Sequence, residues 1–579
     1  MGVPQLFRHL ARACPGAVRT LADAQRQQQQ QQRCHELHVD FNSVVHTCAR
    51  AVEEEDGDRG STEEHETRVI EACLRHLETL TAKIAPLDRV FVAVDGAPPR
   101  AKMHQQRQRR FVAVHRTDAV GRWDTNAVTP GTAFMERLGA ALKERALSPL
   151  MPGGPRLEVS GADEPGEGEQ KIFARIRANG NGNGRRHWVY GLDADLLLMA
   201  MSSPAPACVA IVREQELGGP LQVVEAADLA RYAAAEVLRA CGPGAAAAAM
   251  PAEADRVLEF VAACALLGND FVPALPGLRI RDGGVQAVLR ALGRALCSPR
   301  MQAGRRLAVG GPDALGGLDP GVLSAVAEAL AKDESGALCD LERRHAERAA
   351  SADAAKARGG RRGGAQRHPD HELREQPQQR PLSMMLEDDH PMRMRQPPSV
   401  SRGGEPGWRA RYYRTLFGGA CSPDDVHGAC LAYAAGVAWS VAYIARGRCL
   451  SWGWHYPHAH APTALDLHHA TTVGDVRSVG QGAAAAFDAA DEAHAAGERA
   501  LGSREAWQLL LVLPPQSAAL QPSEAARAAV ADAGLGCAHM FPHRFEVCCY
   551  LREKLHECPA LLPEPDAKLL IRSLSRCKK

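Results

Sequence analysis

The run from Phe91 to Phe111 joins a strand pattern directly to a helix pattern, and this junction limits the folds open to the chain. Phe91–Val94 is a short, β-rich apolar run, which predicts a buried strand that ends at Asp95-Gly96. Two prolines, Pro98 and Pro99, then favour the start of a helix. Because α/β sheets bind ligands at the carboxyl ends of their strands, we expect Asp95 at a ligand-binding edge.

The predicted helix carries its cations on one face. Lys102, Gln106, Arg109 and Arg110 stand at i, i+4, i+7 and i+8, so three cations and an amide point the same way. A basic face on its own is more often a solvated helix surface than a binding site. Beside an acid at a sheet edge it also suits an anionic polymer. Other parts of the chain decide between these interpretations.

Further short apolar runs alternate with helical patterns before residue 351. Leu37–Val39 and Trp188–Tyr190 have the same strand character as Phe91–Val94. We therefore predict an α/β fold with a mixed, largely parallel central sheet flanked by helices.

Composition changes sharply between residues 351 and 406, which are rich in Arg, Gly, Gln and Pro and lack aliphatic periodicity. Such a segment buries too little apolar surface to fold, so we predict a disordered linker over 351–406. It divides the chain into a first region, 1–350, and a second region, 407–579. In the second region, Val426–Arg446 and Ala486–Gln508 have mainly helical patterns.

Charge, apolar runs and cysteines limit the setting in which the chain works. With 69 Lys and Arg against 68 Asp and Glu, any binding of nucleic acid must come from local basic patches. The uncharged run Cys430–Ala445 is too short and too rich in Ala and Gly to favour a membrane span over a buried helix. The seventeen cysteines form no CxxC pair and no signal peptide precedes them, so we expect reduced thiols inside a cell.

Acidic residues stand at the ends of several predicted elements. Asp40 and Asp95 each end a strand pattern. Glu167 and Glu169 flank Gly168 at the start of a helix, where glycine lets the backbone turn sharply and the helix terminus favours negative charge. We expect the two glutamates to converge.

Three more acids follow along the chain. Asp193 and Asp195 are two residues apart, so an extended chain would point both side chains the same way. Asp270 follows an apolar helix, and Gly268 and two prolines fix the turn there. Taken alone, any of these acids is as often a surface charge or a helix cap.

A cluster of seven bare carboxylates would repel strongly. Two like charges about 4 Å apart cost about 4 kcal/mol even at an effective dielectric constant of about 20. Divalent cations relieve this repulsion, and all-oxygen ligand sets suit Mg²⁺ or Mn²⁺. Two such ions can hold the attacking and leaving oxygens of a phosphodiester displacement, so we predict phosphodiester hydrolysis at this edge.

Taken together, these residues resemble the XRN family of 5′-to-3′ exoribonucleases, and the resemblance runs through most of the chain outside the linker. The first region is similar, in order, at MGVPQLFRHL, HVDFNSVVH, AVDGAPPRAKMHQQRQRRF, NAVTPGTAFM, PGEGEQKI, YGLDADLLLM and LLGNDFVPALPGL. The second region is similar at GWRARYYRTLF, SWGWHYP, LLLVLPPQS and MFPHRFEV. Several of these motifs are long and unusual.

The resemblance implies a PIN/flap-nuclease-like core and a mainly helical second region that closes the active site into a pocket. It also implies that two Mg²⁺ ions, or Mn²⁺ in their place, are bound by seven acids: Asp40, Asp95, Glu167, Glu169, Asp193, Asp195 and Asp270. The pocket for a 5′-monophosphate would be formed by Lys102, Gln106, Arg109 and Arg110, which agrees with their one-face spacing.

The resemblance further implies that His46 and a tryptophan of SWGW, Trp452 rather than Trp454, stack on the first bases of the RNA. Alone, His46 is more often a packed helix residue and either tryptophan a core anchor. The expected substrate is single-stranded RNA with a 5′-monophosphate, hydrolysed to nucleoside 5′-monophosphates. We expect a monomer without a membrane partner, and decapping or RNA-processing factors are candidate partners.

The chain departs from the family pattern at several places. Only Val112–Trp123 separates the basic helix from DTNAVTPG, so the projecting tower helix of the family is shortened. The aromatic motif reads WHYPHAHAP where the family usually has a Tyr-His-Tyr sequence, so Ala459 and His460 leave the RNA-facing detail open. Ala274 stands where a histidine is common. The long C-terminal extension of the cytoplasmic enzymes is missing, so we expect a minimal catalytic form.

Two other functions stay open at the level of sequence. A structure-specific DNA nuclease of the flap type uses a similar acid cluster, and a catalytically silent RNA-binding scaffold would keep the basic face. The phosphate-pocket motif argues against the first, and the intact acids argue against the second. The motifs do not separate cytoplasmic messenger-RNA decay from nuclear RNA processing.

Overall fold

The structure is a computed structural model of the 579-residue chain. It describes residues 5–28, 33–56, 61–115, 123–150, 153–179, 184–214, 219–242, 252–301, 304–308, 316–359, 390–419, 421–472, 476–531 and 536–577.

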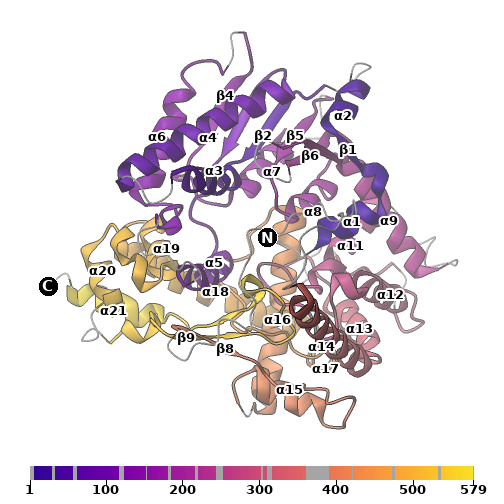
Figure 1. Cartoon of the computed structure of the whole chain (residues 1–579). Helices are drawn as coiled ribbons and strands as arrows, with labels where there is room; N and C mark the ends of the chain where they lie inside the picture. The colour runs from indigo at the N-terminus through magenta and orange to yellow at the C-terminus, as the bar shows by residue number, and fades with distance from the viewer. Residues whose placement is uncertain are drawn as a thin grey trace.

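A seven-stranded sheet forms the centre of the first region (Figure 1). Its strands lie in the order β1 (Val18–Thr20), β7 (Leu221–Glu225), β6 (Val209–Glu214), β5 (His187–Tyr190), β2 (Glu36–Asp40), β3 (Arg89–Ala93) and β4 (Arg156–Ser160). The strands from β6 to β4 are parallel, and β7 and β1 add antiparallel pairs on one side. The predicted mixed, largely parallel sheet is confirmed, and the predicted strands are β2, β3 and β5.

Helices cover both faces of the sheet. The first face carries α3 (Phe41–Asp56), α4 (Thr62–Ile84) and α6 (Ala133–Arg145), and α2 (Leu21–Gln28) packs beside it. The second face carries α1 (Leu6–Ala13), α7 (Gly168–Ala178), α8 (Asp195–Met201), α9 (Ala226–Cys241) and α11 (Glu253–Ala265). Strand residues alternate between the two cores: Val39 and Val92 enter the first, and Phe91 and Val189 enter the second. Both faces are buried.

The second core continues into a group of helices beside the sheet, α12 (Gly284–Leu296), α13 (Pro320–Ala331), α16 (Pro423–Arg446) and α17 (Ala464–Thr472). Among the described residues, α16 alone is long and apolar enough to cross a membrane, and 83% of its most apolar window is buried inside the protein. Tyr433 and Trp439 of α16 are fully enclosed. The prediction that Cys430–Ala445 is a buried core helix is confirmed.

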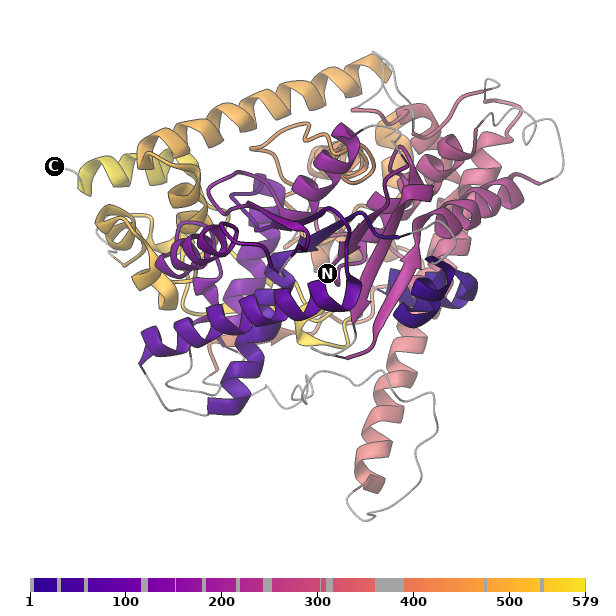
Figure 2. The same ribbon diagram turned by 90° about the horizontal axis from the view of Figure 1, so that it is seen from above.

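The rest of the second region is mainly helical, with α15 (Trp408–Leu416), α18 (Val476–Leu501), α19 (Arg504–Val512), α20 (Glu524–Ala531) and α21 (Ala567–Cys577). Figure 2 shows α18 as a long helix along one side of the molecule. The helical pattern predicted over Ala486–Gln508 is broken near its end. Gly502 has a positive φ of 84°, and the Ser503 hydroxyl accepts a hydrogen bond of 3.1 Å from Ala506 N to begin α19.

The structure differs from the predicted linker, 351–406, at both of its ends. Helix α14 (Glu334–Gly359) runs past residue 351 and points away from the rest of the molecule in Figure 2. Residues 360–389 lie outside the described residues. Strand β8 (Met392–Arg395) pairs with β9 (Phe545–Cys548), which pairs with β10 (Ala560–Leu561). The sequence MRMR alternates apolar and charged residues, a strand signal that the arginine-rich composition hides.

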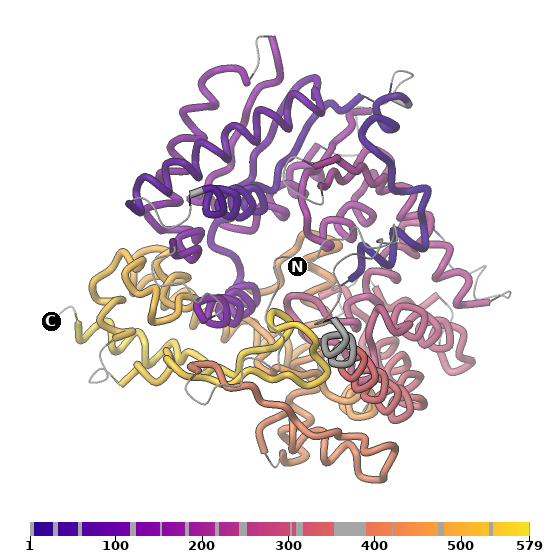
Figure 3. The backbone as a smooth tube through the Cα atoms, viewed as in Figure 1, coloured from indigo at the N-terminus to yellow at the C-terminus, as the bar shows by residue number. Residues whose placement is uncertain are grey.

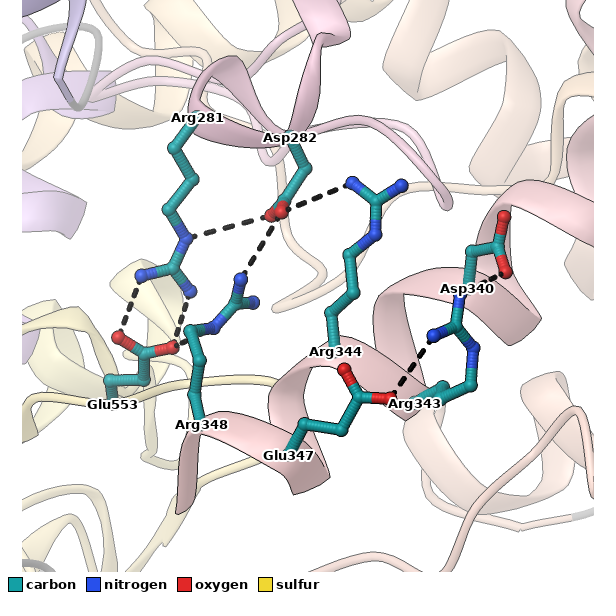
Figure 4. Close-up of polar contacts among 8 residues, drawn as sticks. All are labelled: Arg281, Asp282, Asp340, Arg343, Arg344, Glu347, Arg348 and Glu553. Atoms are coloured by element: carbon teal, nitrogen blue, oxygen red, sulfur yellow. Dashed lines mark hydrogen bonds and ion pairs between the residues drawn. The ribbon is translucent and has the colours of Figure 1, made fainter. Parts of the chain in front are cut away.

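An ion-pair network joins α14 to two distant parts of the chain (Figure 4). Arg281 pairs with Glu553 at 2.5 Å, and Arg348 pairs with Glu553 at 2.9 Å and with Asp282 at 3.2 Å. Arg344 lies 3.6 Å from Asp282. The network holds the one-turn helix Ile280–Asp282, α14 and the segment after β9 together.

Candidate active site at the carboxyl edge of the sheet

Helix α5 (Arg100–Val114) stands at the carboxyl edge of the sheet, where β3 ends. Pro99 caps the helix in an extended conformation, and Arg100 N donates a hydrogen bond of 2.7 Å to Trp452 O. Figure 3 shows the backbone of α5 between the first-region elements and the C-terminal segments, and it packs on α19 and β10. The predicted helix start after the two prolines is confirmed.

The seven predicted acids come from separate elements that end or begin at this edge. Asp40 is the last residue of β2, and Asp95 follows β3. Glu167 is the N-cap residue of α7, and Glu169 belongs to its first turn. The remaining three lie before α8, at the start of α8 and after α11: Asp193, Asp195 and Asp270.

Mutual electrostatic effects show that these acids form one connected group. Burial, and then the charges of Asp95 and Asp193, raise the pKa of Asp40 well above its usual range. Burial and Asp270 raise the pKa of Asp195 to about 7. Burial, and then the charge of Glu167, also raise the pKa of Glu169 well above its usual value. Each shift means that the site needs positive charge before all the acids can ionise.

Gly168 is required by close packing at the centre of this group. Its N–H donates a hydrogen bond of 2.6 Å to Asp95 Oδ1. A Cβ at this position would lie 2.9 Å from Ala93 O, closer than real Cβ atoms approach, and 3.1 Å from Asp40 Oδ1, closer than most do. The sequence predicted a sharp turn here, and the structure adds that the backbone itself lies against two of the acids.

The prediction of an extended chain at Asp193 and Asp195 is wrong. Ala194 between them is helical, with φ −72° and ψ −23°, and Asp195 is the first residue of α8. The two acids nevertheless both act on Glu169, because each raises the pKa of that carboxyl. A helix N-terminus favours negative charge, which explains why the helix begins here.

Lys102 bridges the basic helix to the acids. Its ammonium nitrogen lies 3.0 Å from Asp270 Oδ2 and 3.3 Å from Glu167 Oε2. Burial disfavours its charge, but these two carboxylates hold the pKa of Lys102 well above its usual value. The predicted phosphate-binding lysine is therefore an ion-pair partner of the predicted metal ligands in this structure.

The other three predicted phosphate-binding residues differ in their surroundings. Arg110 donates to Thr129 Oγ1 and lies 3.4 Å from Asn126 Oδ1. Gln106 Oε1 accepts a hydrogen bond of 3.1 Å from Gln508 Nε2. Arg109 is exposed and makes no hydrogen bond or ion pair with the described residues, although its charge lowers the pKa of Asp270. Arg109 is thus the cation of this face that is open to a ligand.

His46 lies on α3 with water access to its ring, next to this face. The pKa of His46 is lowered to about 4. The main cause is that the surrounding atoms remove water from the imidazole, and the positive charges of Arg109, Arg110 and Arg50 add to this effect. Its imidazole is therefore neutral near pH 7, the form that stacks on a base without adding charge.

The two tryptophans of SWGW lie in different environments. Trp454 is buried against α16, so that a Cβ on Gly436 would lie 2.8 Å from its ring. Trp452 is half-buried, and the Arg504 guanidinium lies 5.2 Å from its ring centre. Only Trp452 of the two has a ring that water reaches to a substantial extent.

Three further residues support the site and were not identified from sequence. Asn42 Oδ1 accepts a hydrogen bond of 3.0 Å from Asp95 N. Lys171 donates 2.8 Å hydrogen bonds to the carbonyls of Val94 and Gly161, and burial lowers its pKa to about 8. Lys171 stands four residues after Glu167 in PGEGEQKI, a helical spacing that could have revealed it.

Arg107 is the third such residue. It is fully buried, donates 2.8 Å to Leu511 O and also donates to Met540 O. Its guanidinium lies 4.6 Å from the ring centre of Phe111 and 5.4 Å from that of Phe541. This residue fastens α5 to the second region, so the basic helix is positioned from both sides.

Two groups of mixed histidine and carboxylate donors are also close enough to hold a metal ion among the described residues. One is buried and consists of Glu36, His38 and His187. The other lies near the start of α5 and consists of His104, His455 and Glu564, where Arg100 also pairs with Glu564. The second group joins α5 to the side chain of Glu564, which lies in the C-terminal part of the chain.

Comparisons with known proteins agree with the sequence motifs. Residues 1–215 match the family model described as XRN 5′-3′ exonuclease N-terminus, and residues 332–477 match the Xrn1 helical domain. Six of the seven acids lie in the first match, while Asp270 lies outside both. The second match begins before the predicted linker and continues beyond it.

Curated relatives carry the same family name. The chain is 29% identical over 360 residues to 5′-3′ exoribonuclease 2 of Yarrowia lipolytica, covering 50% of this chain and 35% of the relative. It is 30% identical over 320 residues to 5′-3′ exoribonuclease 1 of Schizosaccharomyces pombe, covering 49% and 23%. The matched part thus spans about a third or less of these relatives. The chain belongs to the XRN family of 5′-3′ exoribonucleases.

Proposed function

We propose that this protein is a 5′-to-3′ exoribonuclease that hydrolyses single-stranded RNA with a 5′-monophosphate and releases nucleoside 5′-monophosphates. The observation that carries the proposal is the position of Lys102, which lies 3.0 Å from Asp270 while belonging to the same helix face as Arg109. A helix that reaches both the acids and open solvent can hold an RNA end beside the bond that is cut.

The donor set fits divalent cations. The buried Glu167 Oε1 has no hydrogen-bond partner among the described residues, and burial, followed by the charges of neighbouring acids, raises the pKa values of Asp40, Glu169 and Asp195. Carboxylate oxygens are the ligands that Mg²⁺ and Mn²⁺ prefer. We propose that the seven acids hold two Mg²⁺ ions. When bound, the ions would activate water and stabilise the charge that develops on the phosphodiester.

The chain's own residues would then position the RNA. Arg109 is the open cation for the terminal phosphate, and Arg110 is held in place by Thr129. His46 and Trp452 would stack on the first bases without reading their sequence. Lys102 would exchange a carboxylate partner for the terminal phosphate when an RNA end binds.

A three-substrate assay tests this function. RNA with a 5′-monophosphate, RNA with a 5′-hydroxyl and flapped DNA are each incubated with Mg²⁺ or with EDTA. We expect Mg²⁺-dependent degradation of the first alone, and loss of that activity in Asp193→Ala. Equal degradation of the 5′-hydroxyl and 5′-monophosphate RNAs would contradict the end recognition, as would equal degradation of a capped RNA tested as a fourth substrate. Cleavage of the flap would favour the DNA nuclease, and binding without hydrolysis would favour a scaffold.

The setting of the activity is also a proposal. All seventeen cysteines are free, which supports a reduced intracellular compartment. We propose a monomer acting in RNA turnover or processing, with decapping or processing factors as partners.

A further inference from the structure

A compact group of metal-type donors lies at the amino-terminal ends of the strands that carry the acids. Glu36 begins β2, His38 follows two residues later, and His187 begins β5. β2 and β5 are parallel neighbours, with Glu36 opposite His187. Because side chains alternate along a strand, all three project from the same face of the sheet. This group is at the opposite end of the strands from the active site.

The three donor atoms are spaced as the ligands of one ion are. His38 Nε2 lies 3.1 Å from His187 Nδ1. Glu36 Oε2 lies 3.8 Å from His38 Nε2 and 3.7 Å from His187 Nδ1. A triangle with these sides has a point about 2.1 Å from all three corners, which is the length of zinc–nitrogen and zinc–oxygen bonds in proteins.

One oxygen of the carboxylate in this group lacks a hydrogen-bond partner among the described residues. Glu36 is 1% exposed, and its Oε2 atom accepts no hydrogen bond from the described residues. The nearest cations stand at 3.8 Å, Arg175, and 3.9 Å, Arg185. Both pair more closely elsewhere, Arg175 with Glu158 at 2.7 Å and Arg185 with Asp88 at 2.7 Å. A buried carboxylate oxygen without a close donor is costly, and a bound cation would satisfy it.

We propose that Glu36, His38 and His187 bind one Zn²⁺ ion. Two imidazole nitrogens and one carboxylate oxygen suit zinc and not magnesium, which prefers oxygen ligands alone. The second oxygen of Glu36 or a water molecule completes four-fold coordination. The ion is distinct from those proposed at the acid cluster.

The position of the ion indicates a structural role. It joins β2 to β5, and these strands lead to Asp40 and to Asp193 respectively. Helix α7 covers the same face, since the Arg175 guanidinium lies 4.7 Å from the ring centre of Phe91. A metal at this place would fix the spacing of two strands that deliver acids to the catalytic edge.

Zinc binding by the 579-residue chain tests the proposal. The chain is stripped with a chelator and titrated with Zn²⁺ against a chromophoric competitor, with Mg²⁺ in excess. We expect one tight equivalent of zinc, at least about 100-fold weaker binding in Glu36→Gln and His187→Ala, and a zinc-dependent rise in Tm in the parent alone. Glu36→Gln keeps the size of the side chain, so its circular dichroism shows whether the fold survives.

Two controls separate this site from other zinc ligands. His455→Ala removes the other histidine–glutamate group and should keep the bound zinc. Substitution with Co²⁺ reports the ligand type, and we expect a spectrum without the near-ultraviolet band of cobalt–thiolate bonds. The proposal is overturned if Glu36→Gln binds zinc as tightly as the parent, if zinc is lost in His455→Ala instead, or if the thiolate band shows that cysteines hold the metal.

Discussion

Lys102 and Asp270 form a buried ion pair, with 3.0 Å between the ammonium nitrogen and the carboxylate, although 168 residues separate them in the chain. The pair connects the helix that carries the basic face to the turn after α11. It also places one cation inside a group of acids in which burial, and then the charges of neighbouring acids, raise several pKa values. We expect the stability of the site, and its response to the proposed metal ions, to depend on this pair.

Replacing Lys102 with methionine should destabilise the protein most in the absence of metal. The change leaves Glu167 and Asp270 buried without their cation, which costs about 3 kcal/mol in the free energy of unfolding. Mg²⁺ should recover part of that loss, because it supplies positive charge to the same acids. Chemical denaturation in EDTA and in Mg²⁺ measures both effects. Lys332→Met is the matched control. Lys332 is exposed and its ion pair with Glu328 is long, at 4.0 Å, so this substitution should change the free energy of unfolding little. A loss that Mg²⁺ does not reduce would contradict the account.

Gly168→Ala should damage both the fold and the activity. Its added methyl group would collide with Ala93 O and Asp40 Oδ1, so we expect a loss of about 1–3 kcal/mol in stability and weaker Mg²⁺ binding. Gly139→Ala is the matched control. Gly139 lies within α6 with open space around it, so alanine there should stabilise the protein by about 0.5–1 kcal/mol. Similar effects of the two substitutions would show that the close packing at Gly168 is unimportant.

Arg107→Ala should loosen the attachment of α5 to the second region. The substitution leaves the carbonyls of Leu511 and Met540 without their buried donor and opens a cavity beside Phe111. We expect a loss of about 3 kcal/mol or more in the free energy of unfolding. Limited proteolysis should cut the second region earlier than in the parent. The exposed Arg343 on α14 provides the control, and Arg343→Ala should leave both measurements close to those of the parent.

Glu259 should make stability depend on pH. Burial raises its pKa from 4.5 to about 7, although its oxygens accept hydrogen bonds of 2.9 Å from Leu307 N and 2.7 Å from Ala308 N. The folded state therefore binds a proton more tightly than the unfolded state. This contribution to stability is full below pH 4.5, falls as pH rises and is lost above pH 7, a change of about 3 kcal/mol.

Denaturation curves from pH 4 to pH 8 test this dependence. Glu259→Gln cannot titrate, so the difference in unfolding free energy between variant and parent should shift in favour of the variant as pH rises through that window. Glu328→Gln replaces a half-buried surface glutamate and is the control, for which we expect a stability difference from the parent without the trend of Glu259→Gln. If the difference in unfolding free energy between Glu259→Gln and the parent stayed constant with pH, Glu259 would have the same pKa in the folded and the unfolded state, contrary to the prediction.

Much of the site was predictable because its residues are tied to local patterns. An apolar run that ends in aspartate predicted the place of Asp40 and Asp95, and the i, i+4, i+7 spacing predicted the face that carries Lys102 and Arg109. The predictions failed where short-range patterns were ambiguous. Asp193 and Asp195 were expected on an extended chain, but a helix begins between them. Strand β8 lay hidden in an arginine-rich segment because its partner, β9, is far away in sequence.

The sequence by itself determined the α/β class, the acids at the ends of the strands and the resemblance to a family, since each depends on residues near one another in the chain. Only the tertiary structure decided how these parts meet. It showed Lys102 paired with Asp270, Arg107 buried under the second region, and Glu36 facing His187 across two strands. Such pairings depend on long-range packing and on which charged groups are buried next to one another. Neither can be predicted from residues that are near one another in the sequence.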